Sequence, residues 1–184
     1  MKTDTIVQFE CFETKESLDE FILQWEYYAK KFSNLGIEVT LQQQTLVKNR
    51  FKYVSQHSWP EENFQFDFMK GRHSGVFPEG GVKVVQAGGY AAVQFECNHD
   101  TFTDDIKVML FVHNAETDLQ LYRSLKSYRY LNIYESYYES CLYAYIIEFF
   151  VEKNNITHFI ELLETNGCGG VEHGLYRECF VLNK

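Results

Sequence analysis

The sequence lacks the features that mark a disulfide framework, a nucleic-acid partner or a membrane segment. Its five cysteines in 184 residues are an odd number without CxxC spacing, which favours reduced thiols over disulfides or a zinc site. The formal net charge of −9 argues against nucleic acid and an anionic membrane as partners. No apolar run approaches the roughly 18 residues of a membrane helix, and the start of the chain lacks the apolar core of a signal peptide. We therefore expect a cytoplasmic protein.

The glycine fingerprints of nucleotide-binding sites are also absent, both the Rossmann pattern and the P-loop. No set of His, Cys, Asp and Glu has the spacing of metal ligands, so we expect neither a metal nor another cofactor. Aromatic side chains, in contrast, are abundant, with 16 Phe and 13 Tyr. This composition supplies ample apolar surface for a packed core and predicts a folded protein.

The first half of the chain shows strand patterns around one helix. Residues 5–12 alternate apolar and polar side chains, which is typical of a strand. Ser17 and Glu20 form a capping box ahead of helically spaced apolar residues, and Gly36 ends that helix. The other expected elements are a hairpin of strands 37–46 and 50–59 with its turn at Lys48-Asn49, a short helix from Pro60 that buries Phe64 and Phe68, a loop over 71–81, and a closing strand 82–97 bent or bulged at Gly88-Gly89.

The second half repeats this β-α-β-β-α-β order, that of a ferredoxin-like unit. Gly88-Gly89-Tyr90 and Gly174-Leu175-Tyr176 both stand near the start of a closing strand, which supports a duplication. The sequence thus predicts an α+β protein with domains at 1–97 and 106–184 and a polar linker at 98–105. Its expected elements in the second half are strands 106–112, 130–140, 142–151 and 171–182 and helices 117–128 and 155–165.

Three stretches of the first half carry a family resemblance: the helix FILQWEYYAKKF, the strand FKYVSQHSW followed by PEENFQFDF, and the closing VVQAGGY. Over residues 4–96 the chain resembles the antibiotic biosynthesis monooxygenase-type members of the dimeric α-β barrel superfamily. YRYLNIYESYYES and EHGLYRECFV in the second half loosely resemble other branches. The resemblance implies two tandem ferredoxin-like units packed sheet to sheet, so that one chain forms the barrel that family members usually form by dimerising.

The same resemblance implies two activities, cofactor-independent oxygenation of polycyclic aromatic substrates and oxidative breakdown of haem. The haem-degrading branch uses an asparagine on the first strand, a tryptophan in the second helix and a histidine further along. Here the first strand offers Gln8 and Glu10, Phe68 follows Trp59 by nine residues, and His73 lies in a glycine-rich loop. These departures argue against haem degradation, although they leave haem binding open.

Polar residues on otherwise apolar strands are the candidate site. In such a barrel, the face of each sheet not covered by helices is enclosed, so polar side chains there would line a semipolar cavity. The residues expected to do so are Gln8, Glu10, Gln42, Gln44, Gln94 and Glu96.

His57 is the candidate catalytic base, because it lies two residues before Trp59 on the same strand face. Glu10, Gln42 and Tyr90 are expected to orient the substrate, and Trp59 to contact it or to pack. His57 could equally be a hydrogen-bonded structural residue. His173, beside Gly174, could face it from the other half.

Two functions stay open at this point. One is a small-molecule-binding α-β barrel acting as a cofactor-independent monooxygenase on an aromatic or polyketide-like substrate. The alternative is a non-catalytic ligand-binding or stress-response module. His57 in an enclosed space between the sheets would favour the enzyme, and His57 on the outside of a sheet the alternative. The oligomeric expectation is a monomer with an internal pseudo-dimer, or a homodimer.

Overall fold

A computed structural model describes residues 5–45, 50–64, 82–96, 105–113, 129–165 and 171–182 of the chain. Within these ranges the backbone forms eight strands and two longer helices. The elements, in chain order, are β1 (Thr5–Glu13), α1 (Leu18–Ser33), β2 (Glu38–Gln44), β3 (Tyr53–Pro60), α2 (Glu61–Asn63), β4 (Lys83–Glu96), β5 (Asp105–Val112), β6 (Arg129–Ser136), β7 (Tyr145–Glu152), η3 (Lys153–Asn155), α4 (Ile156–Thr165) and β8 (Val171–Leu182).

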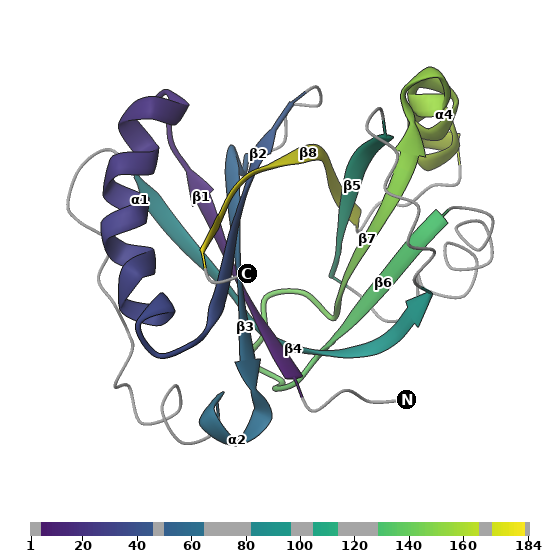
Figure 1. Cartoon of the computed structure of the whole chain (residues 1–184). Helices are drawn as coiled ribbons and strands as arrows, with labels where there is room; N and C mark the ends of the chain where they lie inside the picture. The colour runs from purple at the N-terminus through teal and green to yellow at the C-terminus, as the bar shows by residue number, and fades with distance from the viewer. Residues whose placement is uncertain are drawn as a thin grey trace.

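The eight strands close into one antiparallel barrel in the order β1-β3-β2-β8-β5-β7-β6-β4 (Figure 1). In both halves the first strand is central. β1 lies between β3 and β4, and β5 lies between β7 and β8. This is the strand order expected of a ferredoxin-like unit, with the third and fourth strands flanking the first and the second strand outside the third.

The two halves meet along the edges of their sheets. β2 pairs with β8, and β4 pairs with β6. We expected two separate sheets packed face to face, whereas the hydrogen bonds run continuously around the barrel. The physical reason is that edge pairing satisfies the backbone N–H and C=O groups that four free edges would leave unpaired.

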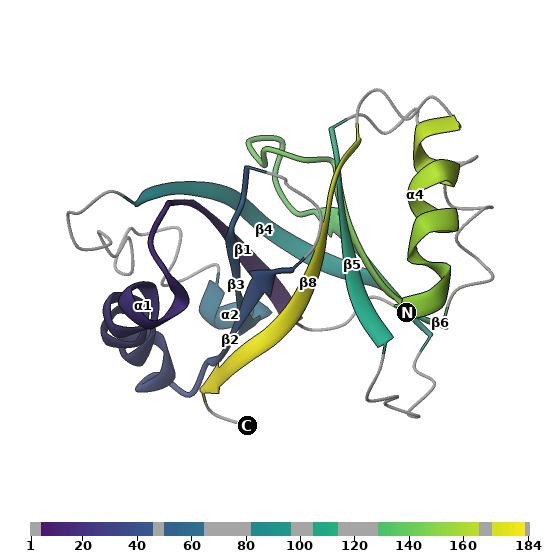
Figure 2. The same ribbon diagram turned by 90° about the horizontal axis from the view of Figure 1, so that it is seen from above.

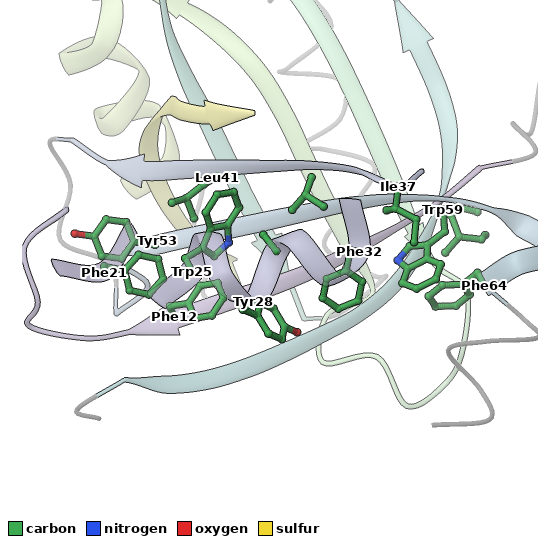
Figure 3. Packing of buried hydrophobic residues seen from close by; sticks show 14 residues of the cluster. Phe12, Phe21, Trp25, Tyr28, Phe32, Ile37, Leu41, Tyr53, Trp59 and Phe64 are labelled. Carbon is green, nitrogen blue, oxygen red and sulfur yellow. The ribbon is translucent and has the colours of Figure 1, made fainter. Parts of the chain in front are cut away.

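Helix α1 begins at a complete capping box, as its sequence predicts. The Ser17 hydroxyl accepts from the backbone N–H of Glu20, and the Glu20 carboxylate accepts from the backbone N–H of Ser17. The helix buries Phe21, Trp25, Tyr28, Ala29 and Phe32. Figure 3 shows these rings against Tyr53, Trp59 and Leu41 of the wall. α1 therefore covers the outer face of β1, β3 and β2.

Helix α4 covers the other side of the barrel. Ile156 and Phe159 of this helix pack on β5 and β7, with the Phe149 and Phe159 rings 5.1 Å apart. Figures 1 and 2 show α1 and α4 outside the wall on opposite sides of the molecule. Neither α1 nor α4, nor the short helices of the described residues, is long and apolar enough to cross a membrane.

The bend predicted at Gly88-Gly89 is confirmed. The register of β4 against β1 shifts by one residue between Gly88 and Gln86, which is a β-bulge. Gly88 has a φ of 116°, a conformation that other L-residues rarely adopt. At Gly89 a Cβ atom would stand 2.4 Å from the Phe64 ring, so the absence of a side chain there allows Phe64 to close the core.

Several predicted boundaries differ from the structure. The strand expected over 130–140 ends at Ser136, because the chain then turns, with Tyr137 donating its N–H to the Gly89 carbonyl at 2.9 Å. The neighbouring strand begins at Tyr145 rather than Leu142. The predictions for residues 98–104, the helix 117–128, the loop 71–81, Lys48-Asn49, Phe68 and His73 lie outside the described residues.

Candidate functional site

The barrel wall is buried on both faces, and this separates the predicted site residues into two groups. On β1, Phe9 and Cys11 belong to the apolar cluster inside the barrel. Gln8 and Glu10 point the other way, to the layer beneath α1. The expectation that these two polar residues line the space between the sheets is therefore wrong.

Glu10 is the centre of the polar network beneath α1. Its Oε1 accepts from the hydroxyl of Tyr28 at 2.7 Å and from the amide of Gln8 at 2.9 Å. Gln8 in turn accepts from the indole N–H of Trp59 at 3.0 Å. Burial raises the pKa of Glu10 to about 7, and the bonds from Tyr28 and Gln8 oppose this rise only in part.

His57 lies in the same layer and is fully buried. Its Nε2 is 2.9 Å from the Ser55 hydroxyl and 3.6 Å from Oε2 of Glu10. The ring also packs edge-on against Phe32, with centroids 4.5 Å apart. Burial lowers the pKa of His57 to about 3, so the ring is neutral at physiological pH and is a weak proton acceptor.

The structure also does not place His173 opposite His57, as the sequence had suggested. His173 pairs with Leu110, a residue of the apolar layer beneath α4. The two histidines thus lie on outer faces of different halves and do not face each other. Trp59 likewise packs beneath α1, against Phe32 and Phe64. Glu10, His57 and Trp59 are therefore brought together, but outside the barrel interior.

Tyr90 and Gln42 do lie inside the barrel. Tyr90 packs on Phe9, with ring centroids 5.5 Å apart, and Phe9 packs on Tyr134 at 5.1 Å. The Tyr90 hydroxyl accepts from the backbone N–H of Tyr143. Gln42 pairs in register with Val54 of the interior cluster and is fully buried. The interior therefore has an aromatic wall with embedded polar groups.

A second polar network, here called the Glu148 cluster, crosses the interior. It consists of Thr40, Gln56, Lys107, Tyr134 and Glu148. Gln56 and Tyr134 donate to the two oxygens of Glu148, the latter at 3.0 Å. Lys107 Nζ lies 3.6 Å from Glu148, and Thr40 donates to Gln56 at 3.2 Å. First-half and second-half strands thus supply one connected set of charges and hydrogen bonds.

The sequence reasoning missed this cluster, although one signal was present. Glu148 is the only charged residue within the apolar run YAYIIEFFV, and a carboxylate in such a strand needs buried partners. Its partner Gln56 is 92 residues away in the chain. Nothing in the local pattern of either strand points to the other.

The end of the barrel where β3 begins is closed by ionic contacts. Arg50 donates to both carboxylate oxygens of Glu172 at 3.1 Å and to the Tyr143 hydroxyl at 3.1 Å. His113 lies 3.1 Å from the same carboxylate. The opposite end, where β3 reaches Pro60, carries the half-buried Thr40 and Gln56.

The described residues offer no group of three or more His, Cys, Asp and Glu that could hold a metal ion. They also do not fit the haem-degrading resemblance. Where that resemblance requires an asparagine on the first strand, this chain has Gln8 and Glu10. Their side chains are hydrogen-bonded to Trp59 and Tyr28 beneath α1.

Comparison with solved structures establishes the class of fold. The chain is similar to the "Putative monooxygenase" of Fusobacterium nucleatum, with a TM-score of 0.53 and 11% identity over 98% of this chain and 94% of that chain. It is also similar to a mutant chlorite dismutase from Candidatus Nitrospira defluvii, with a TM-score of 0.55 and 10% identity over 96% and 92%. No protein-family model and no curated protein matches the chain.

Such low identities show a shared fold alone. The chain has a closed α-β barrel like that of these monooxygenase and chlorite dismutase structures, and it spans nearly their full length. The particular function must be argued from the residues of the barrel interior.

Proposed function

We propose that this protein binds an aromatic small molecule inside the barrel, with the Glu148 cluster as its polar recognition site. The barrel is then a tandem of two ferredoxin-like units in one chain, with domains at 1–97 and 106–184, and the ligand lies where they meet. This arrangement accounts for a polar site whose residues come from both halves.

One observation carries the proposal: an ion pair of Lys107 and Glu148 lies within an aromatic interior. Glu148 is only 2% exposed and Lys107 only 12%. Because a buried ion pair contributes little net stability, its presence favours a role beyond stability. Tyr134 connects the pair to the ring of Phe9. Aromatic surface beside a few convergent polar groups is the usual composition of a small-molecule site.

The cluster has remaining capacity for a ligand. The Lys107 ammonium has three donors, and its ion pair with Glu148, the one found among the described residues, is long at 3.6 Å. The Tyr134 hydroxyl donates its proton to Glu148 and so holds the carboxylate in place beside Lys107. A hydroxyl or carbonyl group on an aromatic ring can therefore bond to this cluster while the ring packs on Phe9 and Tyr90.

Cofactor-independent monooxygenation, which the sequence resemblance implies, needs a base that reaches the substrate. His57 is separated from the interior by the barrel wall, and its lowered pKa makes it a weak base. Both features support the non-catalytic alternative, a ligand-binding module in which His57 is structural. If oxygenation occurs, its proton acceptor is expected in the Glu148 cluster rather than at His57.

Binding can be tested with 2-naphthol as the probe, by isothermal titration calorimetry. The Lys107→Met and Tyr134→Phe variants should each lose about tenfold in affinity, as expected for one hydrogen bond to a polar group. Lys153→Met, which changes an exposed lysine, is the matched control and should bind like the wild type.

Folding of each variant is checked by circular dichroism, because Lys107→Met leaves Glu148 without its cation. His57→Gln should leave the affinity for 2-naphthol unchanged, because His57 lies outside the barrel interior beneath α1. Equal affinities of the wild type, Lys107→Met and Tyr134→Phe would refute the proposed site.

A further inference from the structure

The inner face of β2 presents a row of three polar side chains, Thr40, Gln42 and Gln44. Two of them have partners, since Thr40 donates to Gln56 at 3.2 Å and Gln44 donates to the Phe51 carbonyl at 3.3 Å. Gln42, between them, is completely buried. Among the described residues, neither its amide oxygen nor its amide nitrogen has a hydrogen-bond partner.

Two polar neighbours of Gln42 already make other bonds, and Glu178, its register partner on β8, is exposed. The Gln56 amide donates to Glu148 and accepts from Thr40. The Tyr176 hydroxyl donates to the Phe51 carbonyl at 3.0 Å. Val54, which pairs with Gln42 across the strands, is apolar. A buried amide without any bond is unfavourable and rare in folded proteins, so Gln42 is a candidate for a partner that the described residues do not supply.

We infer that Gln42 recognises the edge of a planar aromatic lactam or amide. This inference rests on the ligand-binding function proposed above and specifies the chemistry of the ligand. A glutamine amide presents one acceptor oxygen beside one donor nitrogen. A cis-amide edge, with its N–H beside its C=O, supplies the complementary pair and forms two parallel hydrogen bonds with it.

The surroundings favour an uncharged ring system. The residues packed inside the barrel are mainly aromatic and aliphatic, including Phe9, Tyr90 and Met109. The positive charge of Lys107 is balanced by the negative charge of Glu148, 3.6 Å away. A neutral lactam gains both hydrogen bonds from Gln42 without bringing an unpaired charge into this interior.

The test compares quinolin-2(1H)-one with its N-methyl derivative, which has the same rings but no N–H donor. Calorimetric titration of the wild type should give at least about tenfold tighter binding of the unmethylated lactam. Gln42→Met, which removes the amide at similar side-chain length, should bind both compounds equally. Gln43→Met is the matched control, because Gln43 faces away from the interior, and it should keep the preference.

Thermal unfolding provides a second readout that a purely structural glutamine would not give. Replacing an unpartnered buried amide by Met should raise the Tm of the free protein by roughly 2–4 °C for a chain of this length. The inference is overturned if the wild type does not distinguish the two compounds, or if Gln42→Met retains the distinction.

The outcomes also separate this inference from the proposed function. Cluster-dependent binding of 2-naphthol without any preference between the two quinolones would refute the role of Gln42 alone. Failure of 2-naphthol and both quinolones to bind would refute the binding function and the inference together.

Discussion

Replacing Glu10 by glutamine tests the electrostatics of the layer beneath α1. The carboxyl is fully buried, and its pKa rises from 4.5 to about 7. This rise corresponds to about 3 kcal/mol, at roughly 1.4 kcal/mol per pH unit. Because the pKa is higher in the folded protein, the stabilising contribution of the protonated carboxyl is fully present below pH 4.5. It is lost as the pH rises to about 7.

The amide introduced by Glu10→Gln would keep the acceptor oxygen for Tyr28 and Gln8 but would not ionise. Wild type and Glu10→Gln should therefore have similar stabilities at pH 4.5, and the variant should be about 3 kcal/mol more stable at pH 8. His57 has the opposite dependence, since its lowered pKa gives stability above pH 6.5 that is lost as the pH falls towards 3. This contribution is present in both proteins and cancels in their difference.

The assay is urea unfolding of both proteins at intervals between pH 4.5 and 8.5, followed by circular dichroism. Glu62→Gln, which changes an exposed carboxylate on α2, should show no such pH dependence. The reasoning is refuted if Glu10→Gln is strongly destabilised near pH 7. That result would mean that Glu10 and His57, 3.6 Å apart, form an ion pair in the folded protein.

Three further substitutions test the fold. Ser17→Ala removes the cap of α1 and should cost about 1 kcal/mol in urea unfolding. Gly89→Ala would place a Cβ 2.4 Å from the Phe64 ring, and we expect a loss of about 1–3 kcal/mol in thermal unfolding, from overpacking. Arg50→Gln breaks the half-exposed pair with Glu172 and should cost under about 1 kcal/mol, with the difference vanishing in 1 M salt.

Local structure was predicted well where interactions between near neighbours in the chain decide it. The capping box at Ser17 and Glu20, the bend at Gly88 and the strands β1 and β8 were all visible as short patterns, because each depends on residues a few positions apart. The end of β6 was not, since it depends on a hydrogen bond between Tyr137 and Gly89, which are far apart in the chain.

The candidate site was predicted in part for a related reason. Glu10, His57 and Trp59 were recognised as unusual, and they do form one buried network. Their position was wrong because alternation along a strand separates two faces without saying which one turns inward. In this barrel both faces are buried, one by a helix and one by the opposite wall, so the usual contrast between apolar and solvated faces gives no guide.

The amino-acid sequence by itself determined the period of the strands, the start of α1, the order of the strands along each half and the acidic, aromatic composition, because these depend on residue type and short spacing. Only the tertiary structure decided that edges pair to close the barrel, that Gln8 and Glu10 lie beneath α1, and that Gln56 meets Glu148 across the interior. Those contacts join residues far apart in the chain, and they exist only once the wall has closed around them.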